Sequence, residues 1–572
     1  MHGFIFVLFN TSEKPDISFN WKKKFDFQDD RVIHKYVSES YIAEKISSKK
    51  FASNSINIEN DNCIIIIEGI ILNINEIITR NKIDNISDFF VNIIKDKKLI
   101  NQLRGNFCGV VYDKKSKTCI AFNNHAATKK IFFYKSSDYV IVSTDLFTIS
   151  KTLKQLGVQR TPDIEAAYYL LSSGFMHDNK TLLNEVKQIR AGEIIEFQRY
   201  FEMNSSYYFH LDQIKENRDS KEQIIENLDS YFSKALDYGF KFDRELNLDS
   251  LVTLSGGLDS RLVSLYAFKK GYRNQQIINF SEFGYADQKI AAKIASDYEL
   301  KINYYKLGPE CLRFIDETVS VNDGLTLYLG SALLLNVVPE IKIKNAGLLH
   351  TGVLGDAILG SYLKSIEPQR AALHDGNYSS FMPDSAVELI KHSINKYDNE
   401  EKYKFYNRGF TGINNGILYY DLITESYSPF LDFDFMSYAL SIPRKFRYQE
   451  RIYIDWMQKK HPDVCNYIWE NIGCKPTNNQ FIRKLYRYKR AVIKRLPVKS
   501  MWKNNMAPEQ LWYNKSQSEK DFMNKYFLQH IDLIDFDNKL KADLQKVFGQ
   551  NGINEKSQAL TYLSAYKLLF LD

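Results

Sequence analysis

Apolar and polar positions follow two different patterns along the chain. Up to about residue 200, apolar side chains come in short runs that are typical of strands, at 3–9, 63–72, 109–112, 118–122, 131–134 and 139–143. A helical pattern interrupts these runs at 87–95, with Ser87 as a candidate N-cap. Strand runs with helices between them predict a layered α+β domain, and we place it at residues 1–205.

The second pattern alternates strand and helix. Residues 201–219 are polar and are expected to form a linker, and 220–238 have helical spacing with Gly239 as the expected end. Strands are then expected around 252–254, 276–280 and 346–350, each followed by a glycine-containing loop and a helix. This order predicts an α/β domain over 215–572, with a doubly wound parallel sheet and ligands at the carboxyl ends of its strands. Residues 480–572 are expected to be a helical C-terminal part.

Composition narrows the function classes. The chain has 572 residues, too many for one core, and its net charge of +7 is small for this length, so neither nucleic-acid wrapping nor an acidic shell is indicated. The six cysteines form no CxxC pair, which argues against a zinc site or a disulfide framework. No apolar run approaches ~20 residues, so no membrane span is expected. We expect a cytoplasmic protein.

The most informative stretch lies where the predicted strand at 252–254 ends. It reads Ser255-Gly256-Gly257-Leu258-Asp259-Ser260, a glycine turn that leads into a helix. Backbone N–H groups of such a turn and the helix dipole favour an anion, typically phosphate. Asp259 is a carboxylate at the same place, which is consistent with Mg²⁺ between it and a phosphate. The loop is not a Walker loop, because no Gly-Lys-Ser/Thr follows.

This stretch resembles the pyrophosphate loop of N-type ATP pyrophosphatases and, with Leu254 before it, that of the asparagine synthetase family. The resemblance implies ATP and Mg²⁺ as cofactors. It implies nucleotide contacts from this loop and from the end of the strand at 276–280. The matching positions are Leu254, Ser255, Gly256, Gly257, Asp259, Ser260, Phe280, Ser281 and Glu282. Asp287 matches an aspartate found after that strand, and a helix N-cap is an equal interpretation of it.

A third loop, Thr351-Gly352-Val353-Leu354-Gly355-Asp356, is similar to the family's Ser-Gly-Glu-Gly-Ala-Asp segment. The resemblance assigns Thr351 and Gly352 to the nucleotide and Asp356, with Asp259, to the metal. Val353 stands where the family has an acid/base glutamate, and it cannot move a proton. Related synthetases that close a β-lactam or a lasso peptide share the nucleotide loops and vary this chemistry.

The N-terminal part resembles the glutaminase domain of class II amidotransferases, which has an N-terminal-nucleophile fold. The phrases RGNFCGVVYD (104–113), IFFY (131–134) and VSTDLFTI (142–149) carry the similarity. The family's nucleophilic cysteine, however, aligns with His2, and its substrate-holding Asn and Glu align with Glu68 and Ile70. The Arg-Asp pair of the resembled family aligns near Asn124-His125. The resemblance therefore implies a domain that keeps the fold without the glutaminase reaction.

Two later segments follow the family's order. Glu425 with residues 428–432 is similar to its Glu-x-Arg-x-Pro-Phe-Leu-Asp phrase, and Lys475 matches a lysine that stabilises the pyrophosphate leaving charge, although a surface lysine is nearly as good an interpretation. Residues 483–503 are basic with interleaved aromatic residues. Such a segment is typical of a solvated helix face, and an acidic partner is the sharper alternative.

Together these features favour an ATP-dependent, AMP-forming amide ligase that joins a carboxylate to ammonia or an amine. Asp259, Asp356 and Lys475 are its candidate catalytic residues. A thiolating or tRNA-modifying enzyme, a non-catalytic nucleotide-binding protein and a glutamine-hydrolysing asparagine synthetase are the alternatives. The carboxylate substrate and the nitrogen source stay open, as does the choice between a homodimer and a separate nitrogen-donor protein.

Overall fold

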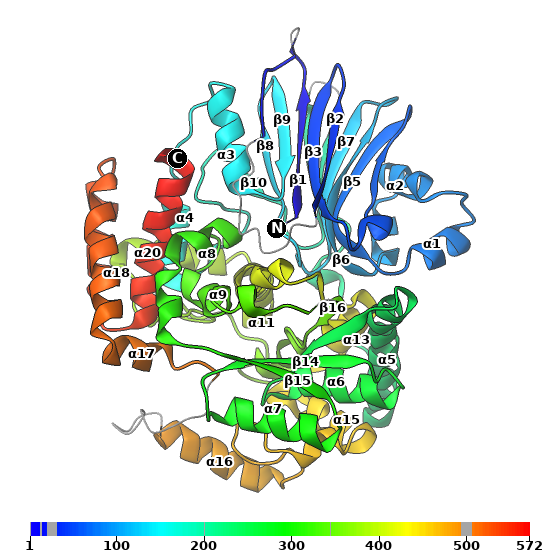
Figure 1. The fold of residues 1–572 in the computed structure, drawn as a ribbon, viewed down its shortest axis with the longest axis vertical. Coiled ribbons are helices and arrows are strands. Elements are labelled where there is room, and N and C mark those ends of the chain that lie inside the picture. Colours follow the sequence, from blue (N-terminus) through cyan, green and yellow to red (C-terminus); the bar gives the residue numbers. More distant parts are fainter. Residues whose placement is uncertain are drawn as a thin grey trace.

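The computed structural model describes residues 2–11, 14–19, 31–198, 201–343, 345–493 and 506–571. Two six-stranded antiparallel sheets form its N-terminal part (Figure 1). One has the order β10-β8-β9-β1-β3-β2 and the other β12-β11-β7-β6-β5-β4. Their strands are β1 (Gly3–Phe9), β2 (Arg31–Val37), β3 (Tyr41–Ser48), β4 (Asn57–Glu59), β5 (Cys63–Ile71), β6 (Gly105–Asp113), β7 (Thr118–Asn123), β8 (Phe132–Lys135), β9 (Tyr139–Ser143), β10 (Lys187–Gln188), β11 (Glu193–Phe197) and β12 (Met203–Tyr207).

Alternation along the strands builds this part into four layers. Phe4 and Phe6 of β1 share one core with Ile64 and Ile66 of β5, so the two sheets face each other. On the outer faces, α2 (Ile86–Lys95) packs against the second sheet, and α3 (Leu146–Gln155) and α4 (Ile164–Ser173) pack against the first. A further helix, α1 (Ile74–Asn81), lies beside α2. This is the layered α+β arrangement expected of an N-terminal-nucleophile type of fold.

A five-stranded parallel sheet forms the centre of the second part. Its order is β15-β14-β13-β16-β17, with all neighbours parallel. The strands are β13 (Asp249–Thr253), β14 (Gln275–Ser281), β15 (Lys301–Lys306), β16 (Ala346–His350) and β17 (Ser426–Tyr427). The chain moves outward on one side of β13 to β14 and β15, and then returns to the other side at β16. Such a reversal creates a crevice at the carboxyl ends of the strands, where doubly wound sheets bind ligands.

Helices surround the parallel sheet and link it to the first part. The longer ones are α5 (Lys221–Glu245), α6 (Leu258–Lys269), α7 (Ala286–Asp297), α8 (Ile315–Asn322), α9 (Tyr328–Leu335), α10 (Val387–Ile394), α13 (Phe433–Ser441), α15 (Arg451–Lys460), α16 (Gln480–Ile493), α17 (Glu509–Lys515), α18 (Gln517–His530), α19 (Asn538–Phe548) and α20 (Ile553–Tyr566). Short helices are α11 (Glu400–Tyr403), α12 (Asn414–Gly416) and α14 (Arg444–Arg447). The C-terminal α20 is almost wholly buried and packs against α4, α8 and α19 (Figure 1). No helix among these described residues is long and apolar enough to cross a membrane.

Three local expectations are wrong. Residues 203–207 of the expected linker form β12, which pairs with β11 and places residue 205 inside a strand. The N-cap of α2 is Asn85, whose side chain accepts the Asp88 N–H, and Ser87 lies inside the helix. The helix that begins after Ser220 continues through Gly239 to Glu245. Gly239 is there for space, since a Cβ would lie 2.7 Å from the Tyr427 ring and 2.8 Å from His350.

Buried ion pairs join the two parts. Lys129 Nζ, in the turn after β7, donates to Asp421 and Glu425 at 2.8 Å each. Arg104, just before β6, donates to Asp434 at 2.7 Å and lies 3.4 Å from Asp432. Because unpaired charges are costly in such a place, these contacts hold the two parts in one relative position.

Candidate functional site

The glycine loop lies at the carboxyl end of β13, as predicted. Ser255 Oγ accepts the Gly257 N–H at 3.1 Å and contacts Ser260 Oγ at 2.9 Å, so the two hydroxyls hold the turn closed. The helix that follows begins at Leu258, which places Asp259 and Ser260 in its first turn. Its N-cap is Gly257, and no side chain caps it. The N-terminus of the helix therefore faces the cavity without a side-chain cap, and Asp259 is the one acidic residue of its first turn.

Asp287 supports the loop from α7. Its Oδ1 accepts the Gly256 N–H at 2.8 Å, and its Oδ2 accepts Asn279 Nδ2 at 2.9 Å. The N-cap of α7 is Tyr285, so Asp287 is not the N-cap that the sequence also allowed. It is 2 % exposed, and its burial raises the pKa of its carboxyl above the usual value. Asp287 thus positions the glycine loop, and it takes up one of the loop's N–H groups.

Asp259 and Asp356 come together, as the sequence predicts. Asp259 Oδ2 accepts the Asp356 N–H at 3.0 Å, and Asp259 Oδ1 accepts the Tyr453 hydroxyl at 2.8 Å. Burial and the Asp356 charge raise the pKa of Asp259 well above its usual value, and burial raises that of Asp356. The Asp259 carboxylate thus bonds the backbone of Asp356 and is affected by its charge, and two neighbouring carboxyls have the donor chemistry that a hard divalent cation requires.

A third carboxyl, Glu450, was missed by sequence reasoning. Burial and the charge of Asp356 raise the pKa of Glu450 to about 7, although Arg487 opposes this and donates to it at 3.1 Å. Both Glu450 and the residue before it, Gln449, have left-handed backbone conformations, with φ of 59° and 58°. Such strain in non-glycine residues is common at functional sites. Neither Glu450 nor Tyr453 stands in a motif, so only the fold reveals them.

The third loop packs directly on the first. A Cβ on Gly352 would lie 2.5 Å from the Ser260 backbone nitrogen, and one on Gly355 would lie 2.8 Å from the Asp259 carboxyl carbon. Leu354 adopts a φ of 62° at the position where the resembled family has glycine. The absence of side chains at Gly352 and Gly355 therefore allows the two loops to touch and brings Asp356 beside Asp259.

A cavity of about 280 Å³ opens where these strand ends meet. Its lining includes eight of the predicted positions: Leu254, Ser255, Gly257, Asp259, Ser260, Phe280, Thr351 and Gly352. Asn279, Asp287, Val353, Tyr420 and Met506 also line it. The first strand, the second strand and the third loop thus contribute to one space, next to the open N-terminus of α6.

Five predicted residues are not among its lining, and the first is Gly256, whose N–H is bonded to Asp287. Ser281 is fully buried and donates to Asn279 at 2.8 Å, and Glu282 accepts the Trp512 indole N–H at 2.9 Å. Asp356 reaches the cavity only through its contact with Asp259. Lys475 is exposed, but its segment approaches the loop, since the Glu470 N–H donates to the Gly256 carbonyl at 3.0 Å.

In the N-terminal part, the position of the resembled nucleophile is occupied by His2, which faces Glu425 of the second part. His2 Nδ1 lies 3.6 Å from Glu425, and Glu68 forms an ion pair with Lys45. Ligand atoms of His2, Glu68 and Glu425 lie within 4.8 Å of one another, which is a metal-like spacing. Lys45 and Lys129 already neutralise the two carboxylates, so we assign no metal there.

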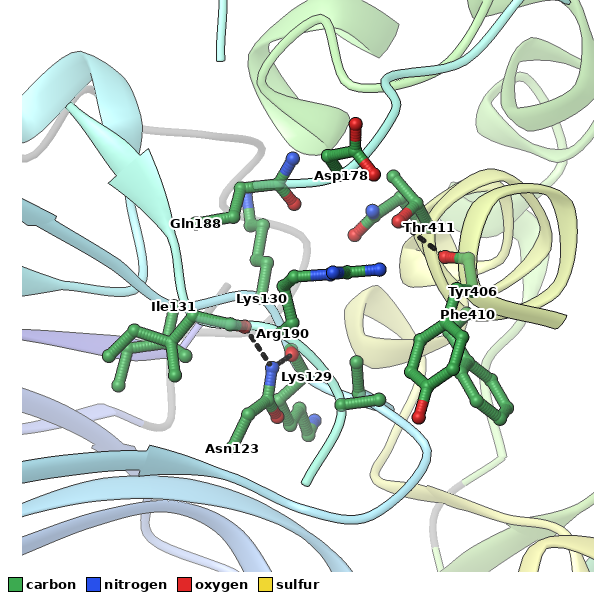
Figure 2. A pocket seen from close by; sticks show the side chains of 14 residues that line it. Asn123, Lys129, Lys130, Ile131, Asp178, Gln188, Arg190, Tyr406, Phe410 and Thr411 are labelled. Carbon is green, nitrogen blue, oxygen red and sulfur yellow. Dashed lines mark hydrogen bonds between the residues drawn. The ribbon is translucent and has the colours of Figure 1, made fainter. Parts of the chain in front are cut away.

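A second, smaller cavity lies between the two parts (Figure 2). The Arg190 guanidinium extends across it, lies 4.9 Å from the Tyr406 ring centre, and donates to the Tyr397 hydroxyl at 2.6 Å. Asn123, Lys129 and Thr411 also line it. Its volume is about 20 Å³, which is enough for a single water molecule and too small for a substrate.

Comparisons with known proteins assign the chain to no family. No protein-family model matches the chain, and no curated protein matches its sequence. Among the solved structures that align with it are two at 10 % identity each. One is a glutamine phosphoribosylpyrophosphate amidotransferase from B. subtilis complexed with ADP and GMP, with a TM-score of 0.21 over 67 % of this chain and 82 % of that one. The other is described as an allosteric regulatory enzyme of purine biosynthesis, with a TM-score of 0.23 over 71 % and 89 %.

At these TM-scores the alignments carry no argument about activity. The evidence for the layered arrangement of the two antiparallel sheets is their strand order in this structure. What the chain does has to be inferred from the loops and the cavity at the carboxyl ends of β13, β14 and β16.

Proposed function

We propose that the chain is an ATP-dependent, AMP-forming amide ligase similar to asparagine synthetases. The observation that carries the proposal is the cavity at the carboxyl ends of the parallel strands, where the open N-terminus of α6 meets the paired carboxylates Asp259 and Asp356. Phosphate binds at helix N-termini, and paired carboxylates suit the cation that accompanies a triphosphate.

In this proposal the loop at 255–260 holds the pyrophosphate, and the adenine lies at the end of β14 beside Phe280. Thr351 and Gly352 complete the nucleotide site. Asp259 and Asp356 would hold Mg²⁺, which supplies positive charge for the phosphates when it is bound. The raised pKa values of both carboxyls support this fit, because a cation would stabilise the charged carboxylates that burial disfavours, and at Asp259 it would also offset the charge of Asp356. Lys475 is proposed to stabilise the leaving pyrophosphate.

The reaction we propose has two steps. The oxygen of a substrate carboxylate attacks the α-phosphorus of ATP, and the bond from that phosphorus to the bridging oxygen of pyrophosphate breaks. An amine or ammonia nitrogen then attacks the acyl carbon, AMP leaves, and the nitrogen loses a proton. Val353 lines the cavity where the resembled family has an acid/base glutamate. Because valine cannot accept a proton, we propose that this proton leaves without a side chain at position 353 as base.

The proposal assigns the reaction to a domain over 215–572, with 480–572 as its helical C-terminal part. The domain over 1–205 is assigned no glutaminase reaction, since His2 stands in place of a thiol and faces Glu425, and Glu68 forms an ion pair with Lys45. The nitrogen then comes from free ammonia, from an amine or from a separate protein, and we propose a cytoplasmic location.

A second candidate is a protein that binds the nucleotide without turning it over. Val353 in the cavity and the exposed position of Lys475 favour it. The two candidates differ in products. Incubation with ATP, Mg²⁺ and a panel of carboxylates should give AMP and pyrophosphate for the ligase. The binding protein gives neither product, and release of ADP and phosphate would contradict the proposed mechanism.

A further inference from the structure

Helix α16 is attached to the protein by its polar side. Arg483 donates to the carbonyl oxygens of Pro476 and Asn478 at 2.7 and 2.8 Å, and Arg487 donates to Glu450 at 3.1 Å. These two arginines are one helical turn apart, so they mark one face of α16. In an ordinary surface helix the face that meets the body of the protein is apolar. Here that face is charged.

The opposite face of α16 is apolar and open. Phe481, Leu485 and Tyr488 follow each other at spacings of four and three residues, so they share a face. Their exposed fractions are 74 %, 56 % and 70 %. The helix lies at the lower edge of the molecule in Figure 1. Three large apolar side chains on one open helical face are more than isolated exposure, which is normal on protein surfaces.

Positive charge flanks this apolar face. At 100° per residue, Lys484 and Lys489 lie on either side of the line through Phe481, Leu485 and Tyr488. The charge extends along the chain as well. Residues 471–508 contain no Asp or Glu, and residues 481–505 contain nine basic side chains: Arg483, Lys484, Arg487, Lys489, Arg490, Lys494, Arg495, Lys499 and Lys503.

We propose that α16 binds the surface of an anionic lipid bilayer, with Phe481, Leu485 and Tyr488 in the headgroup region and the flanking lysines on lipid phosphates. An apolar face bordered by lysines matches a helix that lies in the plane of a membrane interface. Such lysines keep their ammonium groups in the polar layer while their stems cover apolar surface. The phosphates of a nucleic acid could bind the lysines, but a nucleic acid has no hydrocarbon layer in which Leu485 could be buried.

The proposal places the protein at a membrane without a span. It is independent of the ligase chemistry, because the three apolar residues do not line the nucleotide cavity. The exposed side of α16 is turned away from Glu450 and the carboxylates near it, since Arg483 and Arg487 attach the other side. A membrane could therefore bind α16 without displacing the cavity's residues.

The test is co-sedimentation of the full chain with vesicles. Vesicles of phosphatidylcholine mixed with phosphatidylglycerol should bind it, and vesicles of phosphatidylcholine alone should not. Replacing the face by Phe481→Ser, Leu485→Ser and Tyr488→Ser together should weaken binding by about tenfold or more, because apolar burial drives insertion. Lys484→Glu with Lys489→Glu should weaken it similarly and should reduce its dependence on salt.

The matched control is Leu528→Ser on α18, which removes an apolar side chain that is also 70 % exposed. It should leave binding unchanged, and circular dichroism should show the same helix content in every variant. Three results would overturn the proposal. They are no binding to the anionic vesicles, equal binding by the triple variant, and binding to duplex DNA or an acidic peptide in place of vesicles.

Discussion

At the scale of single residues, Asp259 combines two requirements that oppose each other. It lies in the first turn of α6, where a carboxylate is favourable, and it also lies against Asp356, where a second negative charge is not. Burial and this neighbour raise the pKa of Asp259 well above its usual value. The protein therefore holds a carboxylate in a position that a bound cation would stabilise.

We predict that Asp259→Asn lowers turnover about a hundredfold or more, since electrostatic contacts at the reacting charges have effects of this size. Its stability should stay equal or rise, because the change removes one of two repelling carboxylates. Turnover and the urea midpoint measure the two effects. The matched control is Asp249→Asn at the other end of β13, which should keep full turnover. An active Asp259→Asn protein would remove this residue from the metal site.

His177 is a residue that should make stability depend on pH. It is fully buried, stacks on Tyr169 with ring centres 4.4 Å apart, and contacts the hydroxyls of Ser173 and Ser393 at 2.9 and 3.0 Å. Burial lowers the pKa of His177 to about 4. A histidine whose folded pKa is lowered stabilises the protein above its unfolded pKa of about 6.5, and this contribution is lost as the pH falls towards 4.

We therefore predict that the urea midpoint falls as the pH is lowered from about 6.5 to about 4, and that the fall is shallower in His177→Asn. The uncharged amide does not titrate and can still bond a hydroxyl. The lowered pKa of His177 corresponds to a loss of about 3 kcal/mol in the free energy of unfolding of the wild type as the pH falls. His125 is buried with a similarly lowered pKa, so part of the slope should remain in the variant. An unchanged slope would show that His177 does not titrate on unfolding.

At the scale of elements, α5 shows how packing overrides a local signal. A glycine usually ends a helix, yet α5 passes through Gly239 because Tyr427 and His350 lie against its backbone. Both neighbours are fixed, since the Tyr427 hydroxyl donates to Ala235 at 3.0 Å and His350 Nε2 lies 2.7 Å from Asp243. The glycine therefore provides close contact between α5 and the edge of the parallel sheet.

We predict that Gly239→Ala destabilises the protein by about 1–3 kcal/mol, because the new methyl group would meet both rings at less than 3.0 Å. Gly330→Ala on α9 is the matched control. A Cβ there meets nothing within 4 Å, so the better helix propensity of alanine should leave stability equal or raise it by up to about 1 kcal/mol. Thermal unfolding of both variants measures this, and equal effects would contradict the packing account.

The elements that the sequence predicted best are those whose signal is local. Gly3–Phe9, Tyr139–Ser143 and Ala346–His350 match their predicted ranges, since continuous apolar runs define buried strands. Strands β2 and β3 were missed, because residues 31–37 alternate around an exposed face and residues 41–48 include charged positions such as Glu44. Their pairing with β1 depends on contacts that no local pattern contains.

The same distinction holds for the candidate site. The loops at 255–260 and 351–356 could be found because glycine and aspartate spacing is local. Tyr453 and Glu450 could not, since their role comes from α15 and the turn before it packing on the paired aspartates. The sequence singled out Asp287 but did not predict that it supports the glycine loop. Its bond to the Gly256 N–H forms only when α7 lies beside the glycine loop in the folded protein.

At the scale of the whole molecule, the interface explains why the N-terminal part should not act as a glutaminase. His2 faces Glu425 of the second part, and Glu68 is paired with Lys45. Glu68 stands where the resembled glutaminases hold their substrate with Asn. The structure shows this charge neutralised within the protein instead. His2 thus contacts the second part through Glu425, whereas the charge of Glu68 is neutralised by Lys45 within the N-terminal part.

We predict that the protein releases no glutamate from glutamine, with or without ATP, because no thiol occupies position 2 and the side chains around it are paired. The measurement is a glutamate assay beside a His2→Ala variant, and both proteins should read as background. Glutamate that appears with the wild type and disappears with the variant would make His2 a nucleophile and contradict this account.

The central claim is that the N-terminus of α6 holds a phosphate of ATP, and Gly257→Asp tests it most directly. Gly257 is the N-cap of α6 and has no side-chain cap, so an aspartate there should stabilise the helix by a few tenths of a kcal/mol while its charge excludes phosphate. A Cβ at this position meets only Ser255 Oγ, at 3.2 Å, so the change requires only a small shift of that hydroxyl.

The measurement is calorimetric binding of a non-hydrolysable ATP analogue with Mg²⁺, with Gly330→Asp as the control for added charge. The account predicts binding by the wild type and the control, and none by Gly257→Asp, whose thermal stability is equal or higher. Undiminished binding by a folded Gly257→Asp protein, or no binding by the wild type, would contradict it.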